Sequence, residues 1–395
     1  MKKYLNLKFK IQIAIINCMF LFGCITEYEA TGIDEVSDIL VVEGFITDDE
    51  SIITLSRSGT LTGSASPYNY VDFAVVYVES DDGTRFYAEP HRWWDSSSWL
   101  RNGRYTIRNG NLNPNNKYRL VLEIEESDGD CDYSPLSSTF CPTNTYIYHS
   151  DYSHPIKTPE IDSIFWMKRG AGQPVMIYVA THSPDNKIMY YRWSYKEDWE
   201  VHSEIEFEEK FPFFCWNLSN SRDLLLGSAE RTVFGRLTDK IVELSPSNRR
   251  FSVLYRITVK QHAISKRAYD YFSNIKKNAE QTGSIFAPIP SELRGNITCI
   301  TDPDRPVIGY VDVSSSTHKQ RYISHREVYE PPRPYCYFVP ADSLLIWYPP
   351  VPGILWDPPE QWILFDPEWY DGEPVYVLDS CVDCSFHGTQ QKPEG

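Results

Sequence analysis

Short runs that alternate apolar and polar positions fill the first part of the chain, as strands with one buried face do. Several runs end in turn-forming residues, and the Asp-Asp-Gly at 81–83 predicts a hairpin. The runs that predict strands are residues 39–47, 51–57, 73–80, 84–90, 103–107 and 117–126. Short strands at this spacing predict an immunoglobulin-like or transthyretin-like β-sandwich, which we assign to residues 36–145.

Turn-forming residues are frequent in residues 146–160, which we interpret as a linker. Strand-like runs resume beyond it, at residues 163–169, 174–183 and 188–201. The clearest alternation is "FSVLYRITVK" at 251–260, whose odd-numbered positions are all apolar and whose even-numbered positions are mostly polar. The sequence therefore predicts a larger β-rich domain over residues 161–395, and a mainly β protein.

One segment has the period of a helix instead. Its apolar positions recur every three or four residues and form one stripe: Ile264, Ala268, Phe272, Ile275 and Ala279. Gly283 then supplies a stop signal. We predict one prominent amphipathic helix over residues 264–281, packed on the sheet by its stripe.

The first 24 residues have the pattern of a secretory signal. Lysines precede an apolar run at 11–22, which is shorter than the roughly 20 residues that a membrane-spanning helix needs. The Leu-Phe-Gly-Cys at 21–24 resembles a bacterial lipobox. We expect residues 1–23 to be removed, Cys24 to carry the lipid anchor and residues 24–35 to form an acidic tether. An ordinary signal peptide or a retained membrane anchor is the alternative.

Composition supports folded domains and argues against one class of partner. Of 395 residues, 42% are hydrophobic and 14% aromatic, which is enough for two packed cores. The net charge is −16, and such an acidic surface repels phosphate backbones. Nucleic acid is therefore not an expected partner.

The secretory signal predicts an oxidising compartment, where cysteines pair. Besides Cys24 the expected mature chain has seven cysteines, an odd number, and we expect Cys299 to stay free. A local bridge is expected between Cys131 and Cys141. Two further bridges are expected among four cysteines, whose three possible connectivities the sequence leaves open: Cys215, Cys336, Cys381 and Cys384.

Cys381 and Cys384 form a CxxC, and His387 follows three residues later. This spacing would also suit a zinc ion, with Cys336 as a further ligand, or a redox-active thiol pair. We favour structural disulfides that fasten the tail to the second domain, because thiols of secreted proteins are rarely left as zinc ligands. No metal site is therefore predicted.

Residues 331–376 combine many prolines with tryptophans. Because proline removes backbone donors, this segment predicts a long ordered loop rather than a central strand or a helix. Trp356, Trp362 and Trp369 are candidates for a ligand or partner surface. The alternative is that they pack down on the second domain.

Catalytic motifs are absent from the sequence: there is no GxSxG, HExxH or P-loop, and no GxGxxG after a strand. The acidic cluster at 204–209 is typical of a solvated face in a chain this rich in acids. We therefore predict no catalytic residues and no cofactor, and a hydrolase is the least favoured function.

Several stretches resemble the family called domain of unknown function 4249. They are residues 40–49, 190–201, 253–297, 307–323 and the CxxC region from 381 to the end. The resemblance implies a lipoprotein of the Bacteroidota outer membrane, facing the periplasm or the cell surface. It implies an accessory to a TonB-dependent transporter in substrate capture or uptake. A stand-alone glycan or peptide binder that uses the tryptophans is the alternative.

Overall fold

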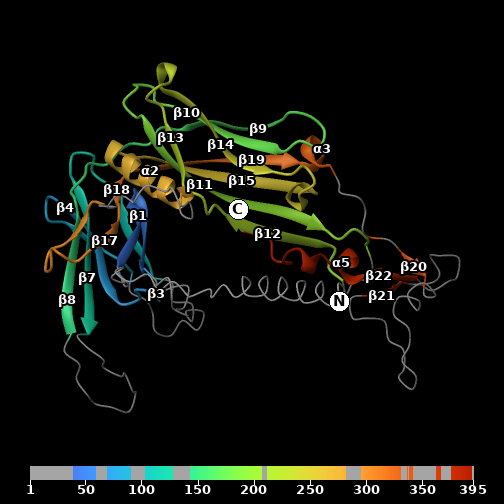
Figure 1. The fold of residues 1–395 in the computed structure, drawn as a ribbon, viewed down its shortest axis with the longest axis horizontal. Coiled ribbons are helices and arrows are strands. Elements are labelled where there is room, and N and C mark those ends of the chain that lie inside the picture. Colours follow the sequence, from blue (N-terminus) through green and yellow to red (C-terminus); the bar gives the residue numbers. More distant parts are fainter. Residues whose placement is uncertain are drawn as a thin grey trace, which may run out of the picture.

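The structure is a computed structural model that describes residues 39–58, 69–89, 103–127, 143–206, 211–281, 295–330, 336, 338–340, 362–365 and 375–393. It is mainly β, as predicted. Figure 1 shows a sandwich at one end, a larger pair of sheets in the middle and a small C-terminal module at the other end. Within the described residues, no helix has the length and apolarity needed to cross a membrane. The expected signal and tether lie outside them.

The N-terminal domain is a β-sandwich of two sheets around one core. One sheet contains β17 (Val307–Gly309), β1 (Leu40–Ile46), β2 (Asp49–Arg57) and β3 (Asn69–Tyr70) in that order, with β18 (Asp312–Val313) beside β1 and β6 (Arg104–Gly110) beside β2. The other contains, in order, β16 (Ile297–Cys299), β8 (Thr143–Ser150), β7 (Tyr118–Ser127), β4 (Ala74–Ser80) and β5 (Arg85–Tyr87). Inward positions of both sheets, such as Ile53 and Leu122, are fully buried between them.

The chain leaves this sandwich after β8 and returns to it much later. β17 and β18 both pair in parallel with β1, and β16 pairs antiparallel with β8. Asn296 holds the return in place: its amide donates to the Val311 carbonyl at 2.8 Å and accepts from the Val311 N–H at 2.9 Å. The chain therefore passes from the sandwich into the second domain, returns to the sandwich, and enters the second domain again with β19 (Ser316–Ser324).

Two boundaries differ from the sequence prediction. The linker proposed at 146–160 begins with strand β8, because the fully buried Tyr148 packs into the sandwich core although turn-forming residues surround it. The sandwich also does not end at 145, since residues 295–314 complete it. The strands of this return have two or three residues each, which is too short for a periodic signal.

The second domain is built from two further sheets. One contains, in order, β14 (Arg236–Leu244), β10 (Val175–His182) and β9 (Ile161–Lys168). The other contains, in order, β12 (Phe214–Asn220), β11 (Tyr190–His202), β15 (Leu254–Ala263) and β19 (Ser316–Ser324), with β13 (Leu225–Ser228) also beside β11. The predicted alternation is present, because Tyr255, Ile257 and Val259 are fully buried between the sheets. The strand begins at Leu254, after a 3₁₀ turn that buries Phe251.

The predicted helix is present as α2 (Lys266–Gln281). Its buried side chains Ala268, Tyr271 and Phe272 pack with Tyr190 of β11 and with Tyr310 of the returning chain. The helix therefore lies at the junction of the two domains rather than simply on one sheet (Figure 1). The apolar stripe ends early, since Ala279 is exposed.

A small module ends the chain. Its sheet contains, in order, β20 (Val339–Pro340), β22 (Val375–Leu378) and β21 (Trp362–Phe365), followed by the short helix α5 (Asp379–Val382) and the 3₁₀ turn η4 (Cys384–Phe386). The structure joins Cys336 to Cys381 within the module and Cys215 on β12 to Cys384. In addition to the Cys215–Cys384 disulfide, Trp216 and Thr389 exchange two backbone hydrogen bonds at 2.7 Å. The tail is thus fastened to the edge of the second domain.

We expect replacement of both Cys215 and Cys384 by serine to lower the free energy of unfolding by up to about 5 kcal/mol, because this bridge closes a separation of 169 residues. Urea unfolding and peptide mapping without reductant measure this. The control is Cys299→Ala, since Cys299 is buried and free. Peptides that join Cys381 to Cys384, or Cys215 to Cys336, would contradict the connectivity.

Candidate functional site

The junction between the two domains is organised around Arg192 in the middle of β11. This residue lies directly opposite His262 of β15, so both side chains project from the same face of the sheet. The alternate positions Tyr191 and Trp193 face the core and are buried. The period of the strand therefore turns one cation out of the core, toward the sandwich and α2.

Two aromatic rings hold this guanidinium. Its central carbon lies 4.5 Å from the ring centre of Phe272 on α2 and 5.2 Å from that of Phe45 on β1. Phe45 in turn stacks on His262, with ring centres 4.3 Å apart and planes 2° apart. Cation–π attraction stabilises such a guanidinium but does not satisfy its hydrogen-bond donors.

Arg192 makes no hydrogen bond and no ion pair with any residue that the structure describes. Burial lowers the pKa of its guanidinium, and the charge of Glu43 partly opposes that shift. Glu43 is exposed and does not form an ion pair with it. A largely buried cation with free donors is costly, and an anion or water that contacts it lowers that cost.

A cavity of about 380 Å³ opens beside Arg192, within the range of small-ligand sites. It lies between the sandwich, β11 and α2, and its walls combine apolar residues with four charged ones: Glu43, Arg192, Arg222 and Asp223. Residues from each side that line it are Val41, Ser194, Leu224, Tyr271, Ile275 and Ile308. The Tyr271 hydroxyl is buried and has no hydrogen-bond partner among the described residues. The cavity thus places the Arg192 cation beside apolar side chains, with the carboxylates of Glu43 and Asp223 also in its walls.

His262 adds no positive charge to the group formed by Arg192, Phe45 and Phe272. Burial, together with the nearby positive charges of Lys260 and Arg192, lowers its pKa to about 3. The imidazole is therefore neutral at physiological pH, and its Nδ1 has no partner within the described part of the chain. Arg192 is accordingly the charged member of the stack.

The model of one protein family matches residues 25–133 and 142–320, which is most of the chain. It is described as a domain of unknown function, DUF4249. The chain belongs to the DUF4249 family. No curated protein matches it.

The matched segments show which parts of the structure belong to DUF4249. They include β1, β11, β15 and α2, and so every element that contributes to the Arg192 stack. The C-terminal module, from Cys336 onward, lies outside them. The cavity is therefore a feature of the DUF4249 region itself.

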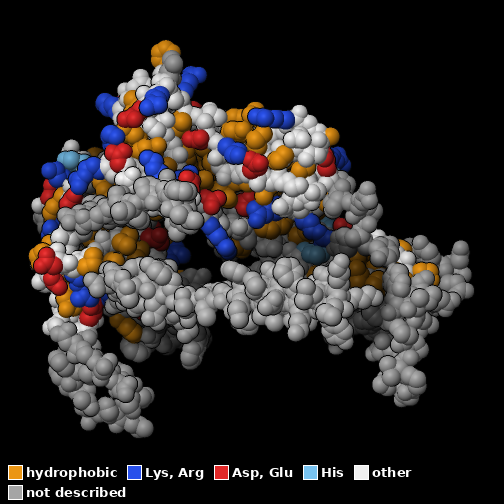
Figure 2. Space-filling view, viewed as in Figure 1, with side chains coloured by type: hydrophobic (Ala, Val, Ile, Leu, Met, Phe, Trp, Pro, Cys, Tyr) orange, Lys and Arg blue, Asp and Glu red, His pale blue; other side chains and the backbone are white. Residues whose placement is uncertain are grey.

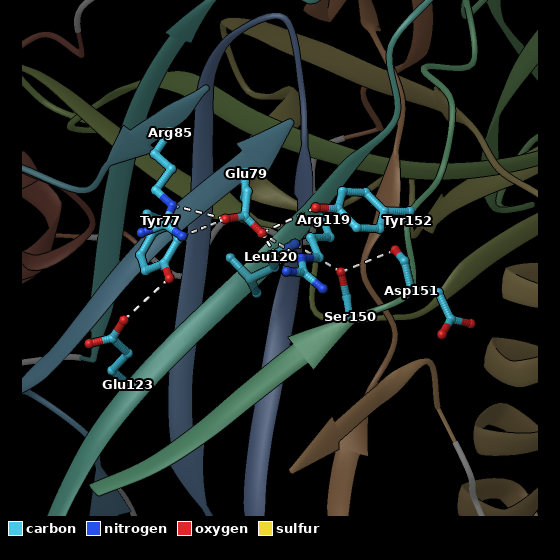
Figure 3. A network of polar contacts seen from close by, with 9 residues as sticks. All are labelled: Tyr77, Glu79, Arg85, Arg119, Leu120, Glu123, Ser150, Asp151 and Tyr152. Atoms are coloured by element: carbon cyan, nitrogen blue, oxygen red, sulfur yellow. Dashed lines mark hydrogen bonds and ion pairs between the residues drawn. The ribbon is translucent and has the colours of Figure 1, made fainter. Parts of the chain in front are cut away.

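Figure 3 shows a second polar cluster, in the sandwich of this DUF4249 protein. Glu79 of β4 is buried and accepts hydrogen bonds from Arg119 at 2.8 Å, Arg85 at 2.9 Å and the Tyr152 hydroxyl at 3.1 Å. Burial raises the pKa of its carboxyl, but the arginine hydrogen bonds outweigh burial and lower it. Its oxygens already have partners, so this cluster is structural, unlike the Arg192 site.

The structure describes only some of the site residues that the sequence predicted. Cys24, Cys131, Cys141, Trp356 and Trp369 lie outside the described residues. The two sulfurs of the CxxC are engaged in disulfides with distant partners, in one of the three connectivities that the sequence left open.

For Trp362 the structure agrees with the alternative given above, in which the tryptophan packs down rather than forming a surface. Trp362 is only 9% exposed, because it lies in strand β21 and packs against the neighbouring strands. Residues 360–366 contain no proline, which explains why a strand forms inside a segment that we interpreted as a loop.

Sequence reasoning missed Arg192. The period of β11 shows that it faces away from Tyr191 and Trp193, but a cation on the polar face of a strand is usual. Its partners Phe45 and Phe272 lie about 150 and 80 residues away in the chain. The sequence alone does not show how these residues are arranged in space. It therefore could not show that the Arg192 cation contacts aromatic rings rather than carboxylates.

The lowered pKa of Glu79 predicts how stability depends on pH. A carboxyl with a folded-state pKa below 4.5 contributes stability above that pH, and the contribution is lost as pH falls through the folded-state value. We expect Glu79→Gln to cost about 1–3 kcal/mol at neutral pH and to flatten the decline toward acid. Urea unfolding at a series of pH values measures this. Glu89→Gln, which removes an exposed ion pair with Arg108, is the control. Equal pH profiles for the Glu79 variant and wild type would refute the prediction.

Proposed function

We propose that this chain is a non-enzymatic lipoprotein of the outer membrane. In this proposal it captures a ligand in the cavity beside Arg192 and acts as an accessory to a TonB-dependent transporter. The observation that carries the capture step is a largely buried guanidinium that forms no ion pair with a described carboxylate, at a cavity of about 380 Å³.

The chemistry of the cavity supports recognition. A guanidinium stays protonated at any physiological pH, and its planar fork suits carboxylates and similar anions. The cavity combines apolar residues such as Leu224 and Ile275 with a few charged side chains, and ligand sites commonly combine apolar surface with a few placed polar groups. Arg192 is also held between Phe45 and Phe272, so a ligand would meet it already oriented.

The location in the envelope rests on the sequence. The lipobox at 21–24 supports acylation of Cys24, and the family resemblance supports a role beside a transporter. Residues 24–38 contain five acids and no Lys or Arg, and β1 begins two residues later. A stretch of this length spans at most about 50 Å, which would keep the folded domains close to the membrane.

The stand-alone binder that uses Trp356, Trp362 and Trp369 receives less support, because Trp362 is buried in β21. The cavity provides an alternative binding site that does not need these tryptophans. What distinguishes an accessory from a stand-alone binder is then a stable association with a transporter.

We expect Cys24→Ala to abolish incorporation of labelled fatty acid, to release the protein from outer-membrane fractions and to end its co-purification with a transporter from solubilised membranes. Radiolabelling, fractionation and affinity purification measure the three results. Cys18→Ala is the matched control, since Cys18 lies inside the apolar run that we expect to be removed. Full labelling of the Cys24 variant, or a labelled wild type that never co-elutes with a transporter, would contradict the proposal.

A further inference from the structure

Two residues that line the cavity, Arg192 and Ser194, lie on the face of β11, β15 and β19 that points away from the buried core. We propose that this face binds an acidic oligosaccharide, a sugar chain with carboxylate or sulfate groups, along a row of three cations that form no ion pair with a described residue. We call these the cationic row: Arg192, Lys260 and Lys196. The inference names the ligand class for the capture step, and in that respect it rests on the proposed function.

The strand register places the row on one face. Opposite Arg192 lies His262, opposite Ser194 lies Lys260, and opposite Lys196 lies Thr258. Directly opposed residues of neighbouring strands project to the same side, so the three cations follow one another diagonally across β11 and β15. His262 lies opposite Arg192 and two positions from Lys260 on β15, so the charges of both act on its imidazole.

The members of the row have no partner in the described part of the chain. Lys196 is exposed and Lys260 is half-buried, and neither makes a hydrogen bond or an ion pair with a described residue. Burial lowers the pKa of Lys260, and the nearby charge of Glu50 opposes that shift. The sandwich therefore turns two carboxylates, Glu43 and Glu50, toward the row, but neither pairs with it.

Pairing is possible on this face, because the next position along it is paired. Arg256 donates to Asp198 at 2.8 Å, directly across β11 and β15. The cationic row is unpaired although the protein has a net charge of −16. In Figure 2, Lys and Arg side chains lie along the lower margin of the middle layer, with Asp and Glu side chains among them. Unneutralised cations gathered in this way attract an anionic ligand.

The length of the row indicates a ligand with several charges. Arg192 and Lys196 are four residues apart on one strand, which corresponds to about 13 Å. One small anion in the cavity reaches Arg192 alone. A ligand that contacts all three cations has to be extended and to carry repeated negative charges.

The other side chains of the face favour a sugar over an acidic peptide. β11 and β15 are inner strands, so their backbone groups are already paired and cannot add a peptide strand. The face presents hydroxyl, amide and imidazole groups around the row, which suit sugar hydroxyls: Ser194, Asn220, Thr258, His318 and Gln320. Tyr322 is 50% exposed at one end and offers an aromatic surface.

The test uses the full mature chain in detergent, titrated calorimetrically with an oligogalacturonate and with a neutral malto-oligosaccharide of equal length. We expect the acidic sugar alone to bind, more weakly at about 0.5 M salt than at about 0.05 M. The double variant Lys196→Ala, Lys260→Ala should lose about tenfold or more in affinity. Removal of the opposing charge by Glu50→Gln should strengthen binding.

The matched control is the double variant Lys187→Ala, Lys240→Ala. It removes the same charge at exposed positions outside the row and should bind like wild type. Thermal unfolding checks that every variant is folded. Binding along the cationic row is refuted if both double variants lose affinity equally. It is also refuted if wild type binds neither oligogalacturonate nor a sulfated oligosaccharide. Equal binding of oligoglutamate and oligogalacturonate would refute the sugar class.

These outcomes are separate from those for the proposed function. If no acidic sugar binds but co-purification with a transporter still depends on Cys24, only the ligand class is wrong. If the sugar binds through the row and no transporter co-purifies, the binding surface stands and the accessory role is wrong.

Discussion

The parallel pairing of β1 with the returning strands β17 and β18 determines how the two domains meet. The chain leaves the sandwich after β8, returns to it at β16, and leaves it again between β18 and β19, so the orientation of the second domain is constrained at several points. That constraint brings Phe45, near the end of β1, against Arg192 and His262. The cavity and the cationic row both follow from this contact.

The chemistry of the contact explains why a binding site remains there. Two aromatic rings stabilise a cation by about 0.5–2 kcal/mol each, yet they leave its N–H groups unused. Glu79 illustrates the opposite arrangement, in which two arginines and a tyrosine occupy the carboxylate oxygens. The arrangement around Arg192 leaves N–H groups that a ligand can accept from. The hydrogen bonds around Glu79 instead hold the sandwich together.

The elements that local pattern determines could be predicted from the sequence. The alternation at 251–260 and the stripe from Ile264 to Phe272 identified β15 and α2, because each depends on neighbours within a few residues. The return at 295–314 could not be predicted, since its short strands are stabilised by distant partners. The unpaired state of Arg192 was likewise inaccessible, because it depends on which distant side chains surround it.

The most direct measurement is an experimental electron-density map of the mature protein around Arg192. The account predicts a guanidinium between Phe45 and Phe272 whose N–H groups face ordered water or a bound anion. A map in which a carboxylate of the chain itself forms an ion pair with Arg192 would contradict the account. The cavity would then be a structural junction without a free cation.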